Sequence, residues 1–201
     1  MRGTRNLGLL IIGAIVLILL AWGCGGYNGL VKQDEVVKNK WGDVQSSYQR
    51  RADLIPNLVN VVRSEATFEQ TTLQNVIEAR AKATQLQVNP NDLTPEKLQQ
   101  FQQAQGQLSQ ALGRLLVVTE NYPTLRSNDA FRGLQSQLEG TENRINVARN
   151  DFNSAVAKYN TKVRSFPTNI FAGIMGFKSR ESFKADEGTQ NVPKVPDNIM
   201  K

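Results

Sequence analysis

The stretch LGLLIIGAIVLILLAWGCGGY, residues 7–27, decides how this 201-residue chain is organised. It lies within a longer segment, Asn6 to Val31, that contains no charged residue. A helix that spans a hydrocarbon core of about 30 Å needs roughly 20 mainly apolar residues, and this stretch supplies them. Trp22 and Tyr27 stand at its far end, where amphipathic rings favour the headgroup layer of a membrane. The sequence therefore predicts an uncleaved transmembrane helix near the N-terminus.

Two other interpretations of this stretch stay open. Its short basic start, Arg2 and Arg5, and its apolar centre also fit a cleaved secretory signal. Cys24, the sole cysteine, is a candidate site for lipid attachment, although the bulky Trp22 departs from the small residues that usually precede a lipid-modified cysteine. All three interpretations send the rest of the chain to a membrane or across it.

The charges on either side of the stretch predict its orientation. Arg2 and Arg5 precede it without an acidic neighbour, whereas the charges between residues 32 and 40 are mixed in sign. Because cytoplasmic flanks carry an excess of Lys and Arg, this pattern favours a cytoplasmic N-terminus and a following domain on the exterior or periplasmic side.

Apolar residues with helical spacing dominate the rest of the sequence. The first stripe has steps of seven, four, three and four residues, which mark one face of a helix: Leu30, Val37, Trp41, Val44 and Tyr48. Proline is disfavoured inside helices, so Pro56 predicts a break at residues 53–56. Asp53 is then the expected cap of a second helix that runs to Leu86.

Turn-forming residues predict two further breaks. Residues 89–94, NPNDLT, are typical of a loop that ends at a helix start, with Thr94 as the cap. Residues 122–127 separate the third apolar stripe from the fourth, and either Ser127 or Asn128 can cap the fourth helix.

Four helices that each carry one apolar stripe must bury it against one another. Short connections make sequence neighbours into spatial neighbours, and steps of three and four favour gently supercoiled packing. The predicted fold class is all-α: an N-terminal transmembrane helix followed by an elongated antiparallel up-and-down four-helix bundle. The expected parts are a membrane anchor at 1–26, the bundle domain at 27–166, and an apolar flap with a flexible tail at 167–201.

The apolar, glycine-rich residues 166–177 have two possible uses. They form either a flap that packs on the end of the bundle, or a patch that touches a membrane or a partner.

The composition argues against most kinds of enzyme. The chain has no histidine, which removes the commonest general base and nearly every zinc site. Bundle di-iron sites also need histidine beside their glutamates, and no phosphate loop or dinucleotide fingerprint is present. The net charge of +6 is interspersed rather than striped, so no nucleic-acid partner is predicted. We therefore predict no catalytic residue, metal site, cofactor or small-molecule substrate.

Three charged clusters supply the candidate interaction residues. Arginine pairs with carboxylates through a two-pronged geometry, so the clusters can form ion pairs that set the register of the helices. The alternative use of the same charges is a site for a ligand or a protein partner. The residues are Arg50, Arg51 and Asp53 in the first cluster, Glu78 and Arg80 in the second, and Glu142 and Arg144 in the third.

Several strings of the sequence resemble the LemA family of bacterial proteins. The most specific is QRRADLIPNLV at residues 49–59, and others are EARA at 78–81, LGRL at 112–115, ENYP at 120–123 and LEGTENRI at 138–145. The resemblance implies an N-terminal transmembrane segment, a helical bundle domain and a place in the bacterial cell membrane. It implies no reaction, because the family has no agreed biochemical activity.

These observations predict a non-enzymatic scaffold or adaptor of the cell envelope that has protein partners or associates with itself. An alternative is a sensor or ligand-binding module that signals through the membrane helix and has a pocket beside Glu65 or Arg80. A third hypothesis is an enzyme that uses only carboxylates and arginines.

Overall fold

A computed structural model describes residues 2–65 and 68–184, without the side chains of residues 2–12, 15–22 and 24. These residues form six α-helices, one short 3-10 helix and no strand, so the predicted all-α class is confirmed. The elements are α1 (Arg2–Arg63), α2 (Gln70–Gln85), η1 (Pro90–Asp92), α3 (Pro95–Thr119), α4 (Pro123–Ser127), α5 (Asp129–Arg164) and α6 (Thr168–Ile174).

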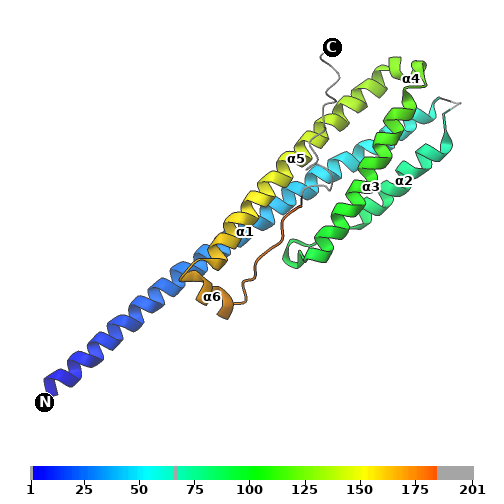
Figure 1. The fold of residues 1–201 in the computed structure, drawn as a ribbon. Helices are drawn as coiled ribbons and strands as arrows, with labels where there is room; N and C mark the ends of the chain where they lie inside the picture. The colour runs from blue at the N-terminus through cyan, green and yellow to red at the C-terminus, as the bar shows by residue number, and fades with distance from the viewer. Residues whose placement is uncertain (1, 66–67, 185–201) are drawn as a thin grey trace, which may run out of the picture.

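The four long helices alternate in direction and lie side by side in an elongated bundle (Figure 1). Helices α1 and α5 pack against each other along much of their length, and α2 and α3 form a hairpin on one side of them. The N-terminal part of α1 extends well beyond the other helices. Its 62 residues correspond to a rod of about 93 Å at 1.5 Å per residue.

Among the described residues, no helix is long and apolar enough to cross a membrane. The predicted transmembrane stretch, residues 7–27, falls mostly on residues whose side chains lie outside the described part. The side chain of Cys24 and the tail from residue 185 onward also lie outside it.

The predicted helix break at residues 53–56 is wrong, because α1 continues through Pro56 to Arg63. Proline has no N–H, so it leaves the carbonyl four residues earlier without its helical donor. That carbonyl belongs to Ala52, and the Arg80 Nε of α2 donates to it at 2.8 Å. Asp53, the expected cap, is instead an exposed residue in mid-helix, and its carboxylate accepts a hydrogen bond from Gln49 Nε2 at 2.7 Å.

The chain leaves α1 only after Arg63, well beyond the break that the pattern predicts. The other two predicted breaks agree with the structure. Thr94 caps α3 by accepting from the Lys97 N–H at 3.3 Å, and Asn128 caps α5 by accepting from the Ala130 N–H at 2.9 Å.

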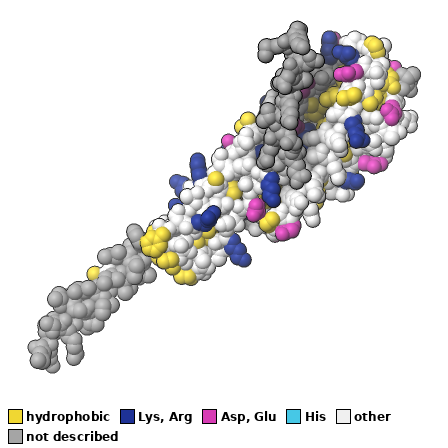
Figure 2. Space-filling view, in the orientation of Figure 1, with side chains coloured by type: hydrophobic (Ala, Val, Ile, Leu, Met, Phe, Trp, Pro, Cys, Tyr) yellow, Lys and Arg dark blue, Asp and Glu magenta, His cyan; other side chains and the backbone are white. Residues whose placement is uncertain are grey.

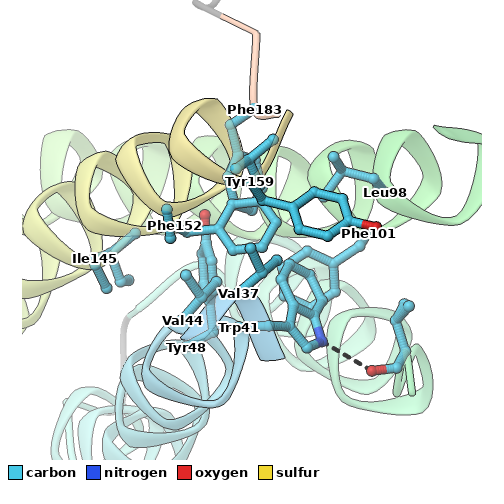
Figure 3. Close-up of a cluster of buried hydrophobic side chains, with 14 of the residues drawn as sticks. Val37, Trp41, Val44, Tyr48, Leu98, Phe101, Ile145, Phe152, Tyr159 and Phe183 are labelled. Atoms are coloured by element: carbon cyan, nitrogen blue, oxygen red, sulfur yellow. Dashed lines mark hydrogen bonds between the residues drawn. The ribbon is translucent and has the colours of Figure 1, made fainter. Parts of the chain in front are cut away.

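The buried apolar side chains form two clusters along the bundle. The first contains Trp41, whose ring lies edge-on to that of Phe101, with the two centroids 5.2 Å apart (Figure 3). The centroid of the Phe152 ring lies 5.5 Å from that of Trp41. Trp41 Nε1 also donates to the Val88 carbonyl at 2.9 Å, which ties the loop after α2 to α1. The second cluster lies toward the α4 end of the bundle and includes Ile55, Leu58, Leu108, Leu115 and Leu138.

Replacing Arg80 with Met removes the donor to the buried Ala52 carbonyl. We expect the free energy of unfolding of the full chain in detergent to fall by about 1–3 kcal/mol, because a buried acceptor is left unpaired. In a Pro56→Ala background the N–H of residue 56 supplies this donor, so the same replacement should cost at least about 0.5 kcal/mol less. Urea unfolding followed by circular dichroism measures both values. Lys82→Met, at an exposed position of α2, is the control; an equal cost of Arg80→Met in both backgrounds would contradict this account.

Candidate functional site

A layer of polar side chains lies between the two apolar clusters, and we call Arg51, Gln105, Ser109 and Glu142 the polar layer. Arg51 belongs to α1, Gln105 and Ser109 to α3, and Glu142 to α5. Tyr48 and Phe101 border the layer on one side, while Ile55 and Leu108 border it on the other. The layer therefore sits where three long helices meet.

Arg51 is the centre of the polar layer, and its side chain is only 2% exposed. Its Nη1 donates to Ser109 Oγ at 2.7 Å and to Glu142 Oε2 at 3.0 Å. Its Nη2 donates to Gln105 Oε1 at 2.8 Å and to the Gln105 carbonyl at 3.3 Å. The guanidinium also lies over the ring of Tyr48, 5.0 Å from the centroid. One arginine thus binds α1 to both α3 and α5.

The fourth long helix is joined to this layer through its backbone. Gln105 Nε2 donates to the Ala83 carbonyl of α2 at 3.3 Å. One residue after Arg51, the Ala52 carbonyl receives the hydrogen bond from Arg80 of α2. Since these contacts have directions that apolar packing lacks, they fix how each helix is rotated and staggered relative to the others.

The energetics of the layer depend on how completely Arg51 is paired. Burial of a charge costs several kcal/mol unless hydrogen bonds and an opposite charge compensate for it. The Nη atoms of Arg51 are fully engaged, whereas its buried Nε has no hydrogen-bond partner. Glu142 is half exposed, so solvent screens this ion pair and the hydrogen bonds to Gln105 and Ser109 carry much of the compensation.

The remaining predicted charges lie on the bundle surface. Arg50 and Arg144 line one shallow cleft of about 270 Å³, together with Asp43. Glu78 is exposed and accepts from Gln74 Nε2 at 3.1 Å within α2. The three sequence clusters therefore divide into an ion pair between buried Arg51 and half-exposed Glu142, a backbone contact made by Arg80, and exposed side chains.

Gln105 and Ser109 were not predicted as site residues. The available signal was the helical spacing of Phe101, Gln105 and Leu108, which puts Gln105 in a stripe of apolar residues, where a buried polar side chain must find partners. The pairing of Gln105 with Arg51 of α1 could not be predicted from the spacing. The predicted break at residues 53–56 ends the first helix too early, so the expected neighbours of Gln105 differ from the observed ones.

A second polar contact holds the segment after α6, residues 177–184, which we call the C-terminal strap. Gly176, with φ +77°, ends α6 in the left-handed conformation and turns the chain back along the bundle. Arg180 of the strap reaches Asp34 of α1, with Nε and Nη2 at 3.0 and 2.7 Å from Oδ1, and donates from Nη1 to the Pro90 carbonyl at 3.1 Å.

Two asparagines of α5 hold the backbone of the strap. Asn160 exchanges two hydrogen bonds of 2.8 Å with the N–H and carbonyl of Arg180. Asn153 does the same for Phe183, at 2.9 and 3.2 Å. Phe183 enters the first apolar cluster and stacks on Trp41, with centroids 6.0 Å apart (Figure 3). This part of the predicted flap and tail is thus docked along the bundle.

Two side chains near Asp34, the partner of Arg180, have shifted pKa values. Burial, with the Asp34 carboxylate as a smaller cause, raises the pKa of the Tyr159 phenol above its usual value. Hydrogen bonds to Glu35 and then to Asp34 raise the pKa of Lys38.

Within the residues that the structure describes, no three carboxylate or cysteine side chains come together in a way that could hold a metal ion. A cleft of about 370 Å³ lies beside Glu65 at the end of α1, lined also by Arg63, Phe68, Leu73 and Ile77. What the polar layer offers chemically is alignment of the helices, and the clefts on the surface are shallow.

Comparison with known proteins shows a match to the family model described as the LemA family over residues 40–196. Magnetosome protein MamQ 2 of Paramagnetospirillum magneticum is 29% identical over 175 residues, covering 79% of this chain and 64% of that protein. Protein LemA of Metamycoplasma hominis is 22% identical over 163 residues, covering 81% of this chain and 71% of that protein. The chain therefore spans somewhat less than two thirds of the MamQ protein it matches.

Replacing Arg51 with Lys keeps the charge but loses the planar fork that reaches three partners at once. We expect the free energy of unfolding to fall by about 1–3 kcal/mol, because lysine leaves buried acceptors unpaired. The matched control is Arg50→Lys, at the adjacent exposed position, which should change it by less than about 0.5 kcal/mol. Thermal unfolding of both full-length variants measures the difference. If the two replacements cost the same, the polar layer does not hold the helices together.

Proposed function

The chain belongs to the LemA family, and from this premise we propose that it is a non-enzymatic, membrane-anchored helical scaffold or adaptor of the bacterial cell envelope. The observation that carries the proposal is the continuity of α1 from Arg2 to Arg63. The uncharged stretch and the first helix of the bundle are one helix, so a force or an orientation imposed on one is passed directly to the other.

The length of the uncharged stretch supports a spanning anchor. Its 21 residues, 7–27, extend about 31 Å as an α-helix, which matches the thickness of a hydrocarbon core. In the same helix, side chains are buried in the bundle from Leu30 onward. The bundle would therefore begin at the membrane surface without a flexible linker, on the exterior side that the flanking charges favour.

The bundle suits a scaffold because its helices are fixed to one another. The polar layer joins α1, α3 and α5 through Arg51, and α2 through Gln105 and Arg80. A rod that is held rigidly at a fixed height above a membrane can position protein partners or further copies of itself. The relatives named MamQ and LemA are compatible with a role that needs no reaction.

A sensor that signals through the membrane helix is the second candidate. The cleft beside Glu65 favours it, since a ligand there would contact the end of α1. A ligand-dependent change confined to that cleft, with no effect on the N-terminal part of α1, would count against it.

The anchor is tested by placing charges in the middle of the uncharged stretch. We expect Val16→Arg/Leu17→Arg to abolish retention of the full chain in carbonate-washed membranes, because each arginine at a bilayer centre costs about 2.5–3.5 kcal/mol. Val117→Arg/Val147→Arg, at exposed bundle positions, should be retained like the natural chain.

Cys24→Ser should also be retained; its loss from the membrane would show that a lipid on Cys24 is the anchor. Reporter fusions after Phe166 give the side of the membrane.

The scaffold role is tested separately by crosslinking in intact membranes followed by mass spectrometry. We expect the chain to be recovered with protein partners or with copies of itself. Recovery of the monomer alone, under conditions that trap known complexes of the same membrane, would contradict the role even if the anchor is retained.

A further inference from the structure

The short helix α6 exposes apolar side chains at the end of the bundle. Phe166 is 79% exposed, Ile170 53%, Ile174 77% and Met175 54%. Ile170 and Ile174 are four residues apart in α6 and so share one face of it, while Phe166 lies just before the helix and Met175 just after it. Figure 2 shows hydrophobic side chains gathered at this end of the bundle, next to the N-terminal segment, with Lys and Arg side chains beside them. We call these four residues the α6 patch.

Aromatic side chains in and just after α6 contact α1 and so fix the position of α6 along that helix. The Phe171 ring lies 3.2 Å from where a Cβ on Gly23 would stand, so the glycine permits this close approach. Phe177, just after α6, meets Tyr27 edge-on with centroids 6.0 Å apart. Both α1 residues belong to the end of the uncharged stretch. The α6 patch is therefore level with the place where an anchor of this length leaves the hydrocarbon core.

Basic residues outnumber acidic ones in the segment around the patch. Residues 158–181, which include α6, contain five basic residues and one acidic residue. Lys162 and Arg164 lie in the last turn of α5, directly before α6, and Lys178 follows it. An apolar face rimmed by lysine and arginine is the chemistry that binds an anionic lipid surface, because apolar groups enter the interface and basic groups pair with phosphates.

We propose that the α6 patch is a second membrane contact, which lies in the headgroup layer of an anionic lipid surface beside α1. This inference rests on the proposed anchor, because only a spanning α1 brings the patch to that height. A second copy of the chain is a poorer occupant. A symmetric contact through the patch would bring two sets of the same basic side chains together, and like charges across an interface oppose association.

The second contact has a consequence for the whole bundle. A single spanning helix leaves the bundle free to rotate about the helix axis and to tilt. A patch that is held at the surface beside that helix selects one side of the bundle to face the membrane.

The test places an environment-sensitive fluorophore on the patch of the full chain. Ile174→Cys is labelled with NBD in a Cys24→Ser background, and the protein is inserted into phosphatidylcholine vesicles with or without phosphatidylglycerol. Val147→Cys, an exposed apolar position on α5, is the matched control. We expect doxyl-labelled lipids to quench the probe at 174 several-fold more than the probe at 147, and more strongly in the vesicles that contain phosphatidylglycerol.

The outcomes separate the patch from the anchor. Retention of the protein in carbonate-washed vesicles with equal, weak quenching at both positions overturns the patch and keeps the anchor. A blue-shifted probe at 174 that lipid quenchers do not reach also overturns it, because protein then covers the patch. Loss of the protein from the vesicles overturns the anchor itself. Lys162→Gln/Arg164→Gln/Lys178→Gln should remove the difference between the two vesicle types; a difference that persists would overturn the role of the basic side chains.

Discussion

The hydrogen bond from Arg80 to the Ala52 carbonyl is the contact on which the rest of the structure depends. Pro56 removes the donor that this carbonyl would have within α1, and a buried carbonyl without a donor would favour a break. The side chain from α2 supplies the donor and allows α1 to run on to Arg63. Because α1 is unbroken, the apolar stretch near its start and the bundle along its second half share one axis.

The polar layer acts on the same helix one residue earlier. Apolar stripes with steps of three and four can slide or rotate past one another at modest cost, whereas Arg51 must meet Ser109, Gln105 and Glu142 together. The buried charge thus selects one register of the helices, at the expense of some stability. A rigid bundle on a continuous helix, with α6 and the strap folded back beside it, is suited to the scaffold role that we propose.

The apolar stripes of α3, of α5 and of α1 up to Tyr48, the loop near residue 90, and the caps Thr94 and Asn128 were predictable from the sequence because each depends on local spacing or local hydrogen bonds. The helix expected from Asp53 to Leu86 is instead divided between α1 and α2. The passage through Pro56 was not, since the compensating donor lies 28 residues away. The pairing of Arg51 with Glu142, across 91 residues, was foreseeable only as an arginine near carboxylates. The strap was missed because its fixation comes from Asn153 and Asn160, whose side chains satisfy backbone groups and leave no pattern of their own.

The most direct test of the continuous α1 is a distance measured across Pro56 in the full chain. Spin labels at Asn39→Cys and Asn60→Cys, both at exposed positions of α1 in a Cys24→Ser background, are separated by 21 residues. An unbroken helix places their backbones about 32 Å apart at 1.5 Å per residue, so double electron–electron resonance should give a narrow distribution near this value. A broad distribution centred well below about 25 Å would mean that the chain bends at Pro56 and that anchor and bundle do not share one rod.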